Sequence, residues 1–473
     1  MTATNSEVRI ERDSMGPMEV PTDALYGAST MRAVLNFPIS DLRFPRTFIR
    51  ALGLIKLAAA RTNNALGNLD EPIMNAIVAA AQEAADGNLD EHFVLDIFQT
   101  GSGTSTNTNA NEVIANRASQ IMGGGLGSRL VHPNDQVNLG QSSNDVIPTA
   151  IHLAALMAIS EELIPALDQL RDELQKKSDE FWPIVKTGRT HLQDATPVRL
   201  GQEFLGFAGQ AQYSIQRLRR VQEGLSEVAL GGTAVGTGVN THPEFSARTC
   251  RLLSQIAGVD VKETGNHFQA QATLDALVEA SGGLKTVAIS LHKIANDIRL
   301  MGCGPRAGLG ELVLPEVQPG SSIMPGKINP VISESVVQVV AQVIGNDATI
   351  ALAGNGGYFE LNTMMPVAAY NILQSISLLA ASASNFAEQC VTGITATSTG
   401  PDMVEKGLML GTALAPSIGY DAAAAIAKQA AATGQTIREV AKQETELTDA
   451  ELDTLLEPTA MTRPGLEVRG GGG

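Results

Sequence analysis

The sequence Gly320-Ser321-Ser322-Ile323-Met324-Pro325-Gly326-Lys327-Ile328-Asn329-Pro330 gathers glycines, prolines, a serine pair, one lysine and one asparagine into a short stretch. Proline interrupts helical hydrogen bonding and glycine adds backbone entropy, so this stretch is predicted to be a loop. The segment that follows, residues 333–344, is apolar on nearly every face, and a helix of that kind is predicted to be buried in a bundle. A polar loop at the N-terminal end of a buried helix favours binding of an anion.

A plainer alternative is that residues 320–330 only connect two helices, with Ser321 and Ser322 as caps. Nucleotide-binding motifs do not fit the stretch. The spacing from Gly320 to Gly326-Lys327 differs from that of a P-loop, and Ile328 stands where that motif requires Ser or Thr. The run Gly236-Thr237-Gly238 lacks the third glycine of a dinucleotide fingerprint.

Composition narrows the class of protein. The chain has 473 residues, a formal net charge of −17 and 44% apolar residues. The negative charge argues against nucleic-acid binding. No apolar run approaches the roughly 18 residues needed to span a bilayer, so we expect no membrane association and a cytoplasmic location. Three widely spaced cysteines suit neither disulfides nor a zinc or iron–sulfur site, and no metal or cofactor is expected.

Apolar residues at helical spacing predict a mainly α-helical fold. Short irregular structure is expected up to about Arg46, and a helix over 71–86. Long helices are predicted over 147–181, 200–230, 267–301 and 332–352, and together they indicate a bundle. Their apolar faces exceed the needs of one core, which favours association of copies.

Domains are predicted over residues 1–140 (helical), 141–366 (the central long-helix bundle) and 367–473 (small and helical). The glycine-rich end from Arg469 is predicted to be a disordered tail.

Clusters of hydroxyl and amide side chains lie at residues 99–109, 141–145 and 188–197. The first could be a solvated linker and the second a plain helix cap, and a lone histidine in the third would usually be structural. Against these alternatives, neutral hydrogen-bond donors are what an acidic protein would use to hold a carboxylate.

Taken whole, residues 320–330 resemble the signature of the fumarase/aspartase superfamily. The Gly101–Asn111 run resembles the first conserved block of that superfamily, and Thr190-His191 with Gly231–Asn240 resembles the second. The class II fumarase branch is the closer resemblance, because of His191, the run Gly356–Asn362 and Gly326 before Lys327. The resemblance implies a three-domain fold that forms a homotetramer with a twenty-helix core, and active sites shared by three subunits.

The resemblance implies reversible, stereospecific hydration of fumarate to L-malate through an aci-carboxylate carbanion. It implies Ser321 as the base, and His191, oriented by Glu334, as the group that handles the opposite proton. Donors to the small dicarboxylate would be Ser102, Gly103, Thr104, Ser142, Ser143, Asn144, Thr190, Ser322, Lys327 and Asn329. A second anion site would comprise Arg129, His132, Pro133, Asn134 and Asp135. Ammonia elimination from aspartate on the same fold remains the alternative, and an inactive crystallin-like protein is a further one.

Overall fold

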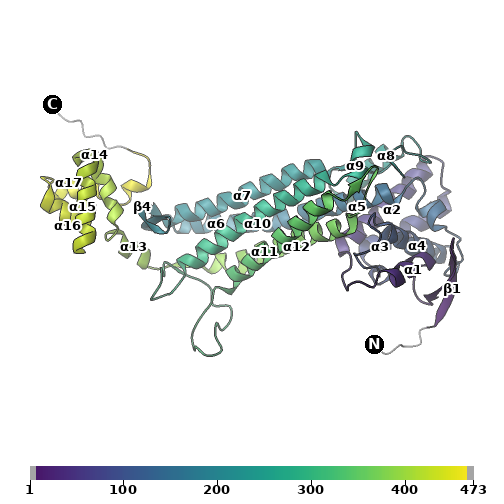
Figure 1. Cartoon of the computed structure of the whole chain (residues 1–473), viewed down its shortest axis with the longest axis horizontal. Coiled ribbons are helices and arrows are strands. Elements are labelled where there is room, and N and C mark those ends of the chain that lie inside the picture. The colour runs from purple at the N-terminus through teal and green to yellow at the C-terminus, as the bar shows by residue number, and fades with distance from the viewer. Residues whose placement is uncertain (1–6, 466–473) are drawn as a thin grey trace. The chain divides into compact units, whose positions relative to one another are not determined.

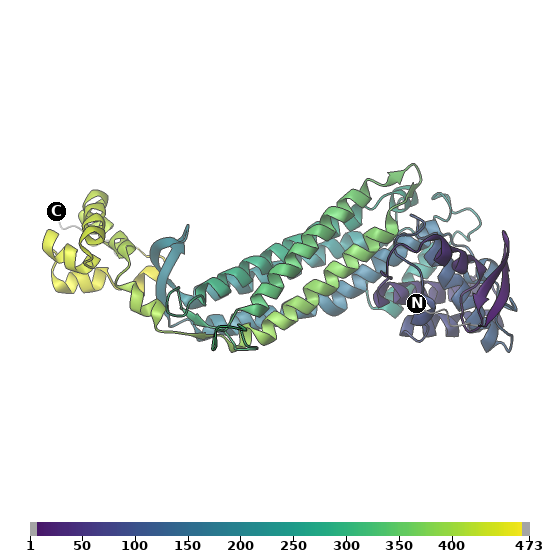
Figure 2. The same ribbon diagram turned by 60° about the horizontal axis from the view of Figure 1, so that its bottom comes forward.

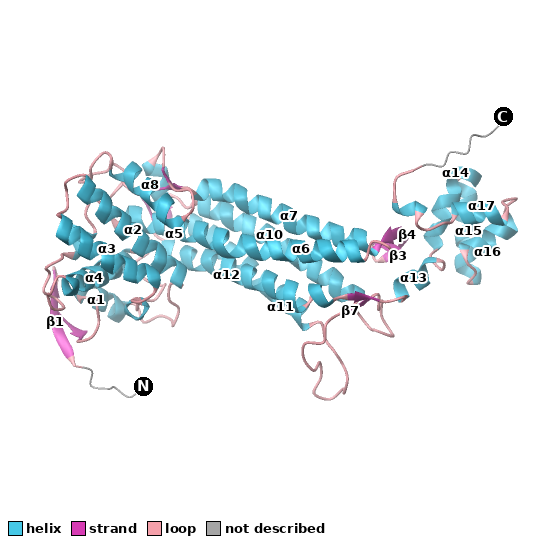
Figure 3. Ribbon diagram, turned by 180° about the vertical axis from the view of Figure 1, so that it is seen from behind, coloured by secondary structure: helices cyan, strands magenta, loops and turns pink. Residues whose placement is uncertain are grey.

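The computed structural model describes residues 7–465 and is mainly helical, with short strands arranged in two-stranded pairs (Figure 3). The predicted fold class is therefore confirmed. Contacts divide the chain into two compact units. The first comprises the described residues up to Pro165 with Ile215–Ala288 and Val339–Ala381, and the second comprises Ala166–Ser214, Ile289–Gln338 and the described residues from Ser382 onward. The prediction of three domains stays a prediction.

The first unit contains a helical core in which α2 packs against α3 and α3 against α4 (Figure 1). Leu57, Ile77 and Val113 from these helices are buried in one apolar cluster. The elements of this unit are β1 (Val8–Asp13), β2 (Gly16–Pro21), α1 (Ala28–Asn36), α2 (Arg46–Ala65), α3 (Glu71–Asp86), α4 (Thr104–Ile121), α5 (Ser143–Ala158), β5 (Glu227–Val228), α8 (Phe245–Ala257), β6 (Lys262–Glu263), α9 (His267–Ala272), β8 (Gly357–Tyr358) and β9 (Leu361–Asn362), with single turns at Asp90–His92, Pro133–Val137 and Ile159–Leu163.

The second unit contains the antiparallel hairpin of β3 and β4 and a small cluster of helices near the C-terminus, yellow in Figure 2. Its elements are β3 (Val185–Thr190), β4 (Gln193–Arg199), β7 (Leu312–Val313), β10 (Thr395–Ala396), α13 (Thr399–Val404), α14 (Ala415–Ile418), α15 (Tyr420–Thr433), α16 (Ile437–Glu444) and α17 (Asp449–Leu455), with turns at Val391–Gly393, Leu408–Leu414 and Ala460–Thr462. The predicted tail from Arg469 lies outside the described residues.

The long helices are α6 (Ile164–Glu180), α7 (Leu200–Leu225), α10 (Asp275–Met301), α11 (Val331–Gly354) and α12 (Met365–Gln389). Polar side chains join them within each unit. In the first unit, Asp347 of α11 accepts hydrogen bonds from Ser281 and Lys285 of α10, at 2.7 and 2.5 Å. In the second, Gln169 of α6 donates to Glu388 of α12 at 2.9 Å. The sequence predicts long helices where α6, α7, α10 and α11 lie, and a helical segment from about residue 367, where α12 lies.

Two predicted element boundaries are wrong. Residues 8–36 are not all irregular, because β1 and β2 form a hairpin that α1 follows, and irregular chain is confined to residues such as 37–45. Asp13 accepts a hydrogen bond from the Met15 amide at 2.9 Å, and Gly16 takes a positive φ, so the tight turn is built from local residues. The helix predicted over 267–301 is broken into α9 and α10, since Thr273 is extended.

Two predictions about apolar helices are also wrong. The first is that no segment is long and apolar enough to span a bilayer. By length and composition, the segments Ser143–Glu180, Val331–Gly354 and Met365–Gly393 could each cross a membrane. Helix α11, expected to be buried all round, is only 33% buried over its most apolar stretch, and its Ile344 and Leu352 are 45% and 67% exposed. A single copy of the chain therefore leaves much of this apolar helix uncovered.

Candidate active site

In the first unit, Ser142-Ser143-Asn144 forms a lip at the start of α5, as the capping pattern predicts. The Ser142 hydroxyl accepts a hydrogen bond from the Asn144 amide at 3.3 Å, and Asp145 accepts from the Ser142 amide at 2.8 Å. The Asn144 side chain donates to the Ala234 carbonyl at 2.8 Å. These bonds fix the backbone of the lip.

The segment Ser102-Gly103-Thr104 leads into α4 and lies in the same unit. The Ser102 and Thr104 hydroxyls are 2.8 Å apart, and Gly103 has a φ of 71°, which favours glycine. The alternative of a solvated linker over 99–109 is wrong. The chain is helical from Thr104, and Asn107, only 2% exposed, donates to the Ser143 hydroxyl at 3.1 Å. The structure thus joins the first polar cluster to the lip.

Two buried charges lie beneath the lip. Lys56 of α2 is fully buried, and its Nζ lies 2.9 Å from both Asn138 Oδ1 and Gln141 Oε1. Burial lowers the pKa of Lys56 to about 7, although Asp145 opposes the shift. Burial also raises the pKa of Asp145 to about 6, against hydrogen bonds from the Ser142, Thr233 and Gly231 amides and the charge of Lys56. Sequence reasoning missed Lys56, whose only signal is a lysine among apolar helical positions.

In the second unit, Thr190 and His191 lie at the exposed tip of the β3–β4 hairpin. Thr190 pairs with Gln193, so His191 and Leu192 are the two central residues of the turn. Both have positive φ, 54° and 62°, as a type I′ turn requires, yet neither is the Asn or Gly that such a turn favours. Strain of this kind costs of order 1–3 kcal/mol per residue and is typical of functional positions.

The 320–330 loop lies between β7 and α11 (Figure 3), so the predicted loop at the start of a helix is confirmed. It is closed by the Gly320 amide, which donates to the Lys327 carbonyl at 2.8 Å, and by Asn329 Nδ2, which donates to the Gly320 carbonyl at 2.6 Å. A Cβ on Gly320 would lie 2.3 Å from the Lys327 carbonyl oxygen, so the closure requires glycine.

Ser321 and Lys327 line a hollow of about 430 Å³ in this loop. The Ser321 hydroxyl oxygen accepts hydrogen bonds from the Ile323 and Met324 amides, at 3.2 and 2.9 Å. Lys327 Nζ donates to Asn329 Oδ1 at 2.5 Å. Ser322 is exposed. The loop therefore surrounds the Ser321 oxygen with donors that would stabilise negative charge on it.

Glu334 is exposed in the first turn of α11. Within residues 7–465 of one chain, no hydrogen bond or ion pair joins His191 to Glu334 or to the 320–330 loop. The pairing of His191 with Glu334 stays a prediction.

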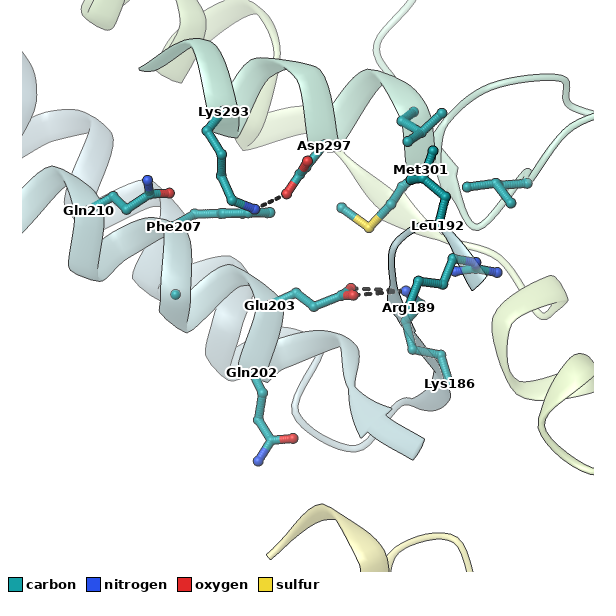
Figure 4. Close-up of a pocket in the computed structure, with 13 residues that line it drawn as sticks. Lys186, Arg189, Leu192, Gln202, Glu203, Phe207, Gln210, Lys293, Asp297 and Met301 are labelled. Carbon is teal, nitrogen blue, oxygen red and sulfur yellow. Dashed lines mark hydrogen bonds and ion pairs between the residues drawn. The ribbon is translucent and has the colours of Figure 1, made fainter. Parts of the chain in front are cut away.

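Beside the hairpin, a cavity of about 450 Å³ is lined by charged and apolar side chains (Figure 4). Lys186 lies 3.0 Å from Glu203, and Lys293 pairs with Asp297. Burial raises the pKa of Glu203, and Lys186 opposes that shift. Sequence reasoning did not single out this cavity.

The predicted second anion segment lies in the first unit. The His132 ring nitrogen accepts a hydrogen bond from the Asp135 amide at 3.1 Å, and Pro133 begins a single turn. Arg129, at a positive φ of 55°, instead donates to the Arg12 carbonyl. Asn134 is exposed. Among residues 7–465, no cluster of three or more His, Cys, Asp or Glu side chains could hold a metal ion.

Comparison with known proteins places these segments in a family context. The sequence matches the family described as Lyase over residues 16–345 and the family described as Fumarase C C-terminus over 410–463. It is 52% identical over 459 residues to Fumarate hydratase class II 2 of Bradyrhizobium diazoefficiens, covering 97% of each chain. It is 54% identical over 463 residues to Fumarate hydratase class II of Halobacterium salinarum, covering 98% of each chain. The crystal structure of recombinant class II fumarase from Schistosoma mansoni matches with a TM-score of 0.95 and 39% identity, over 97% of this chain and 100% of that one.

Proposed function

The chain belongs to the class II fumarate hydratase family, and on that premise we propose that it catalyses the reversible hydration of fumarate to L-malate. It is a lyase that adds water across the double bond, placing hydroxyl on one carbon and hydrogen on the other. The observation that carries the proposal is the near full-length similarity to relatives of this name. Elimination of ammonia from aspartate is not favoured.

The difficult step in the malate-to-fumarate direction is removal of a weakly acidic proton from carbon next to a carboxylate. The charge left behind spreads into that carboxylate, so hydrogen-bond donors aimed at its oxygens supply the main stabilisation. We assign this role to Lys327 and Asn329. The substrate carboxylates would be held by hydroxyls, amides and the backbone at Ser102, Gly103, Thr104, Ser142, Ser143, Asn144, Thr190 and Ser322.

We assign the role of base to Ser321. A free serine is a poor base, but here two backbone amides already donate to its oxygen, which supports an alkoxide at this position. The bond that breaks is the carbon–hydrogen bond, and its proton passes to the Ser321 oxygen. His191, oriented by Glu334, would give a proton to the hydroxyl that leaves as water.

We propose that these residues meet only when copies of the chain assemble into a homotetramer, with three copies contributing to each site. The exposed apolar side chains of the long helices support assembly: Leu205 and Tyr213 of α7, Ile289 of α10 and Ile344 of α11 are 44–60% exposed. Contacts between copies also account for the apolar surface of α11 without a membrane, and we place the enzyme in the cytoplasm. Light scattering coupled to gel filtration tests the tetramer.

The activity is tested by offering the purified chain L-malate and L-aspartate in separate assays. Formation of fumarate is followed by the ultraviolet absorbance of its conjugated double bond. We expect fumarate from malate and not from aspartate, and the Ser321→Ala variant, prepared in the same way, controls for enzymes of the expression host. Fumarate formed from aspartate, and not from malate, would refute the proposed function.

A further inference from the structure

A continuous chain of hydrogen bonds runs from the buried Lys56 to the lip at Ser143, within the first unit. Lys56 Nζ donates to Asn138 Oδ1 at 2.9 Å. The same oxygen accepts from Asn107 Nδ2 at 3.2 Å, and Asn107 Nδ2 also donates to Ser143 Oγ at 3.1 Å. Each link joins segments far apart in sequence, namely α2, the turn before the lip (residues 138–141), α4 and α5.

The direction of every bond in this chain follows from the lysine. A protonated ammonium group can only donate, so Asn138 must turn its oxygen toward Lys56. Asn107 must then turn its NH₂ group toward that oxygen, because two amide oxygens would repel each other. The second hydrogen of the same NH₂ group points at Ser143, whose oxygen therefore accepts.

A serine oxygen that accepts from one side keeps its own hydrogen for another partner. Among residues 7–465 of the chain, no acceptor takes the Ser143 hydroxyl hydrogen. Carboxylate oxygens accept hydrogen bonds and never donate them when ionised. With the opposite polarity, Ser143 would donate to Asn107 and turn lone pairs toward a carboxylate, which would weaken binding.

We propose that Lys56 is a positioning residue that, through Asn138 and Asn107, makes the Ser143 hydroxyl a hydrogen-bond donor to a carboxylate of the substrate. The inference rests on the proposed function, since it concerns how that site receives a dicarboxylate. It also explains why a lysine occupies a fully buried position where an apolar side chain would avoid the desolvation of an ammonium group.

The buried surroundings support the assignment. Lys56 makes no ion pair among the described residues, and its second contact, Gln141 Oε1 at 2.9 Å, is again an oxygen of the turn before the lip. Asn138 in turn donates to the Gln141 carbonyl at 3.1 Å, which holds that turn. Burial lowers the pKa of Lys56 to about 7, so the ammonium form that sets the direction of these bonds predominates below that pH.

Asn107→Ala breaks the chain in the middle and keeps the lysine. We expect KM for malate to rise about tenfold, with kcat changed less, as loss of one hydrogen bond to a charged group predicts. Asn116→Ala is the matched control, because Asn116 is a buried asparagine of the same helix that bonds instead to the Leu25 carbonyl and the Gly127 amide. Its KM should stay within about twofold of the parent.

A double-mutant cycle with Ser143→Ala tests the route. If Asn107 acts through Ser143, then the double variant should have about the KM of Ser143→Ala alone. If KM of the double variant instead rises by the product of the two single effects, roughly a hundredfold, then the proposal is overturned. An Asn107→Ala variant whose KM matches that of Asn116→Ala would overturn it as well.

The lysine itself is tested by comparing Lys56→Gln, which retains an N–H donor, with Lys56→Met, which has none. We expect Lys56→Gln to keep the lower KM, and equal values would contradict the proposal. Thermal unfolding checks both variants, and if either fails to fold, then the Asn107 cycle decides.

Activity of the unaltered chain on malate separates the positioning role of Lys56 from the proposed function. If the unaltered chain turns over malate but the KM effects of Asn107→Ala and Ser143→Ala multiply, then only the role of Lys56 is overturned. If the unaltered chain does not turn over malate, then the proposed function and this inference are overturned together.

Discussion

Replacing the buried Glu311 by glutamine should destabilise the fold. Glu311 lies in the segment before the 320–330 loop and holds that segment against β3, the strand that leads to the turn with His191. Glu311 Oε1 lies 2.7 Å from Arg189 Nη1 of β3. Its Oε2 lies 2.9 Å from Lys186 Nζ, also of β3, as an ion pair outside hydrogen-bonding geometry. Glu311 and Lys186 are only 4% and 2% exposed. Glutamine keeps the shape of the side chain and removes its charge.

The magnitude follows from what remains after the substitution. Removing one partner of a buried ion pair typically costs about 3–5 kcal/mol, because the other charge stays buried and uncompensated. Lys186 would keep Glu203 at 3.0 Å, and Arg189, whose side chain is 21% exposed, would be partly hydrated. We therefore expect Glu311→Gln to lower the free energy of unfolding by about 3 kcal/mol, the lower end of that range.

The assay is denaturant-induced unfolding at one fixed protein concentration, since assembly makes apparent stability depend on concentration. Glu244→Gln is the matched control. Glu244 accepts from Arg248 Nε at 2.8 Å, but both side chains are about half exposed, so a loss of at most ~0.5 kcal/mol is expected. A stability for Glu311→Gln within ~0.5 kcal/mol of the control would refute the reasoning.

Three further predictions concern the proposed base, a buried carboxylate and the thiols. Ser321→Ala should lower kcat by roughly a hundredfold or more with an unchanged circular dichroism spectrum, and near-parental turnover would remove Ser321 from its role. The pKa of Asp145 is raised from the usual 3.8 to about 6, so the folded chain holds a proton that the unfolded chain has lost between those values. The free energy of unfolding should therefore fall as pH rises through that window, and Asp145→Asn should flatten the slope in denaturation at several pH values; an unchanged slope would contradict the assignment. Burial raises the pKa of the Cys250 and Cys390 thiols to about 12, so iodoacetamide should alkylate the half-buried Cys303 first in the native protein, as mass spectrometry can check. Equal rates at all three would count against the described burial.

Local chemistry explains why much of the architecture could be predicted. Helix α3 spans residues 71–86 as its apolar spacing predicts, and Ser142 caps α5 because its hydroxyl and Asp145 bond to adjacent backbone. The loop at 320–330 follows from its glycines and prolines, whose effects on the backbone depend on few neighbours.

Other features depend on contacts that one segment does not determine. Asn107 looks like part of a polar linker, yet it is buried because its amide finds Asn138 and Ser143 across the unit. Lys56 acquires its role only when the turn before the lip packs over α2. Nothing local marks His191 and Leu192 for positive φ, since neither is a residue that favours it.

Apolar patterning was the least reliable guide to burial. Helix α11 looks like a buried core helix, yet Leu352 remains 67% exposed in one chain. The missing information is the partner surface, because a helix face that is covered only on assembly has the composition of a core.

The central claim is that the site is built from residues of different copies of the chain. Chains carrying His191→Asn and chains carrying Ser321→Ala, each with its own purification tag, can be co-expressed and the hybrids isolated. If a site takes His191 and Ser321 from different copies, then about a quarter of the sites in randomly mixed hybrids escape both substitutions, and malate turnover should return toward that fraction of the parental rate. Hybrids that are no more active than either variant alone would contradict the account.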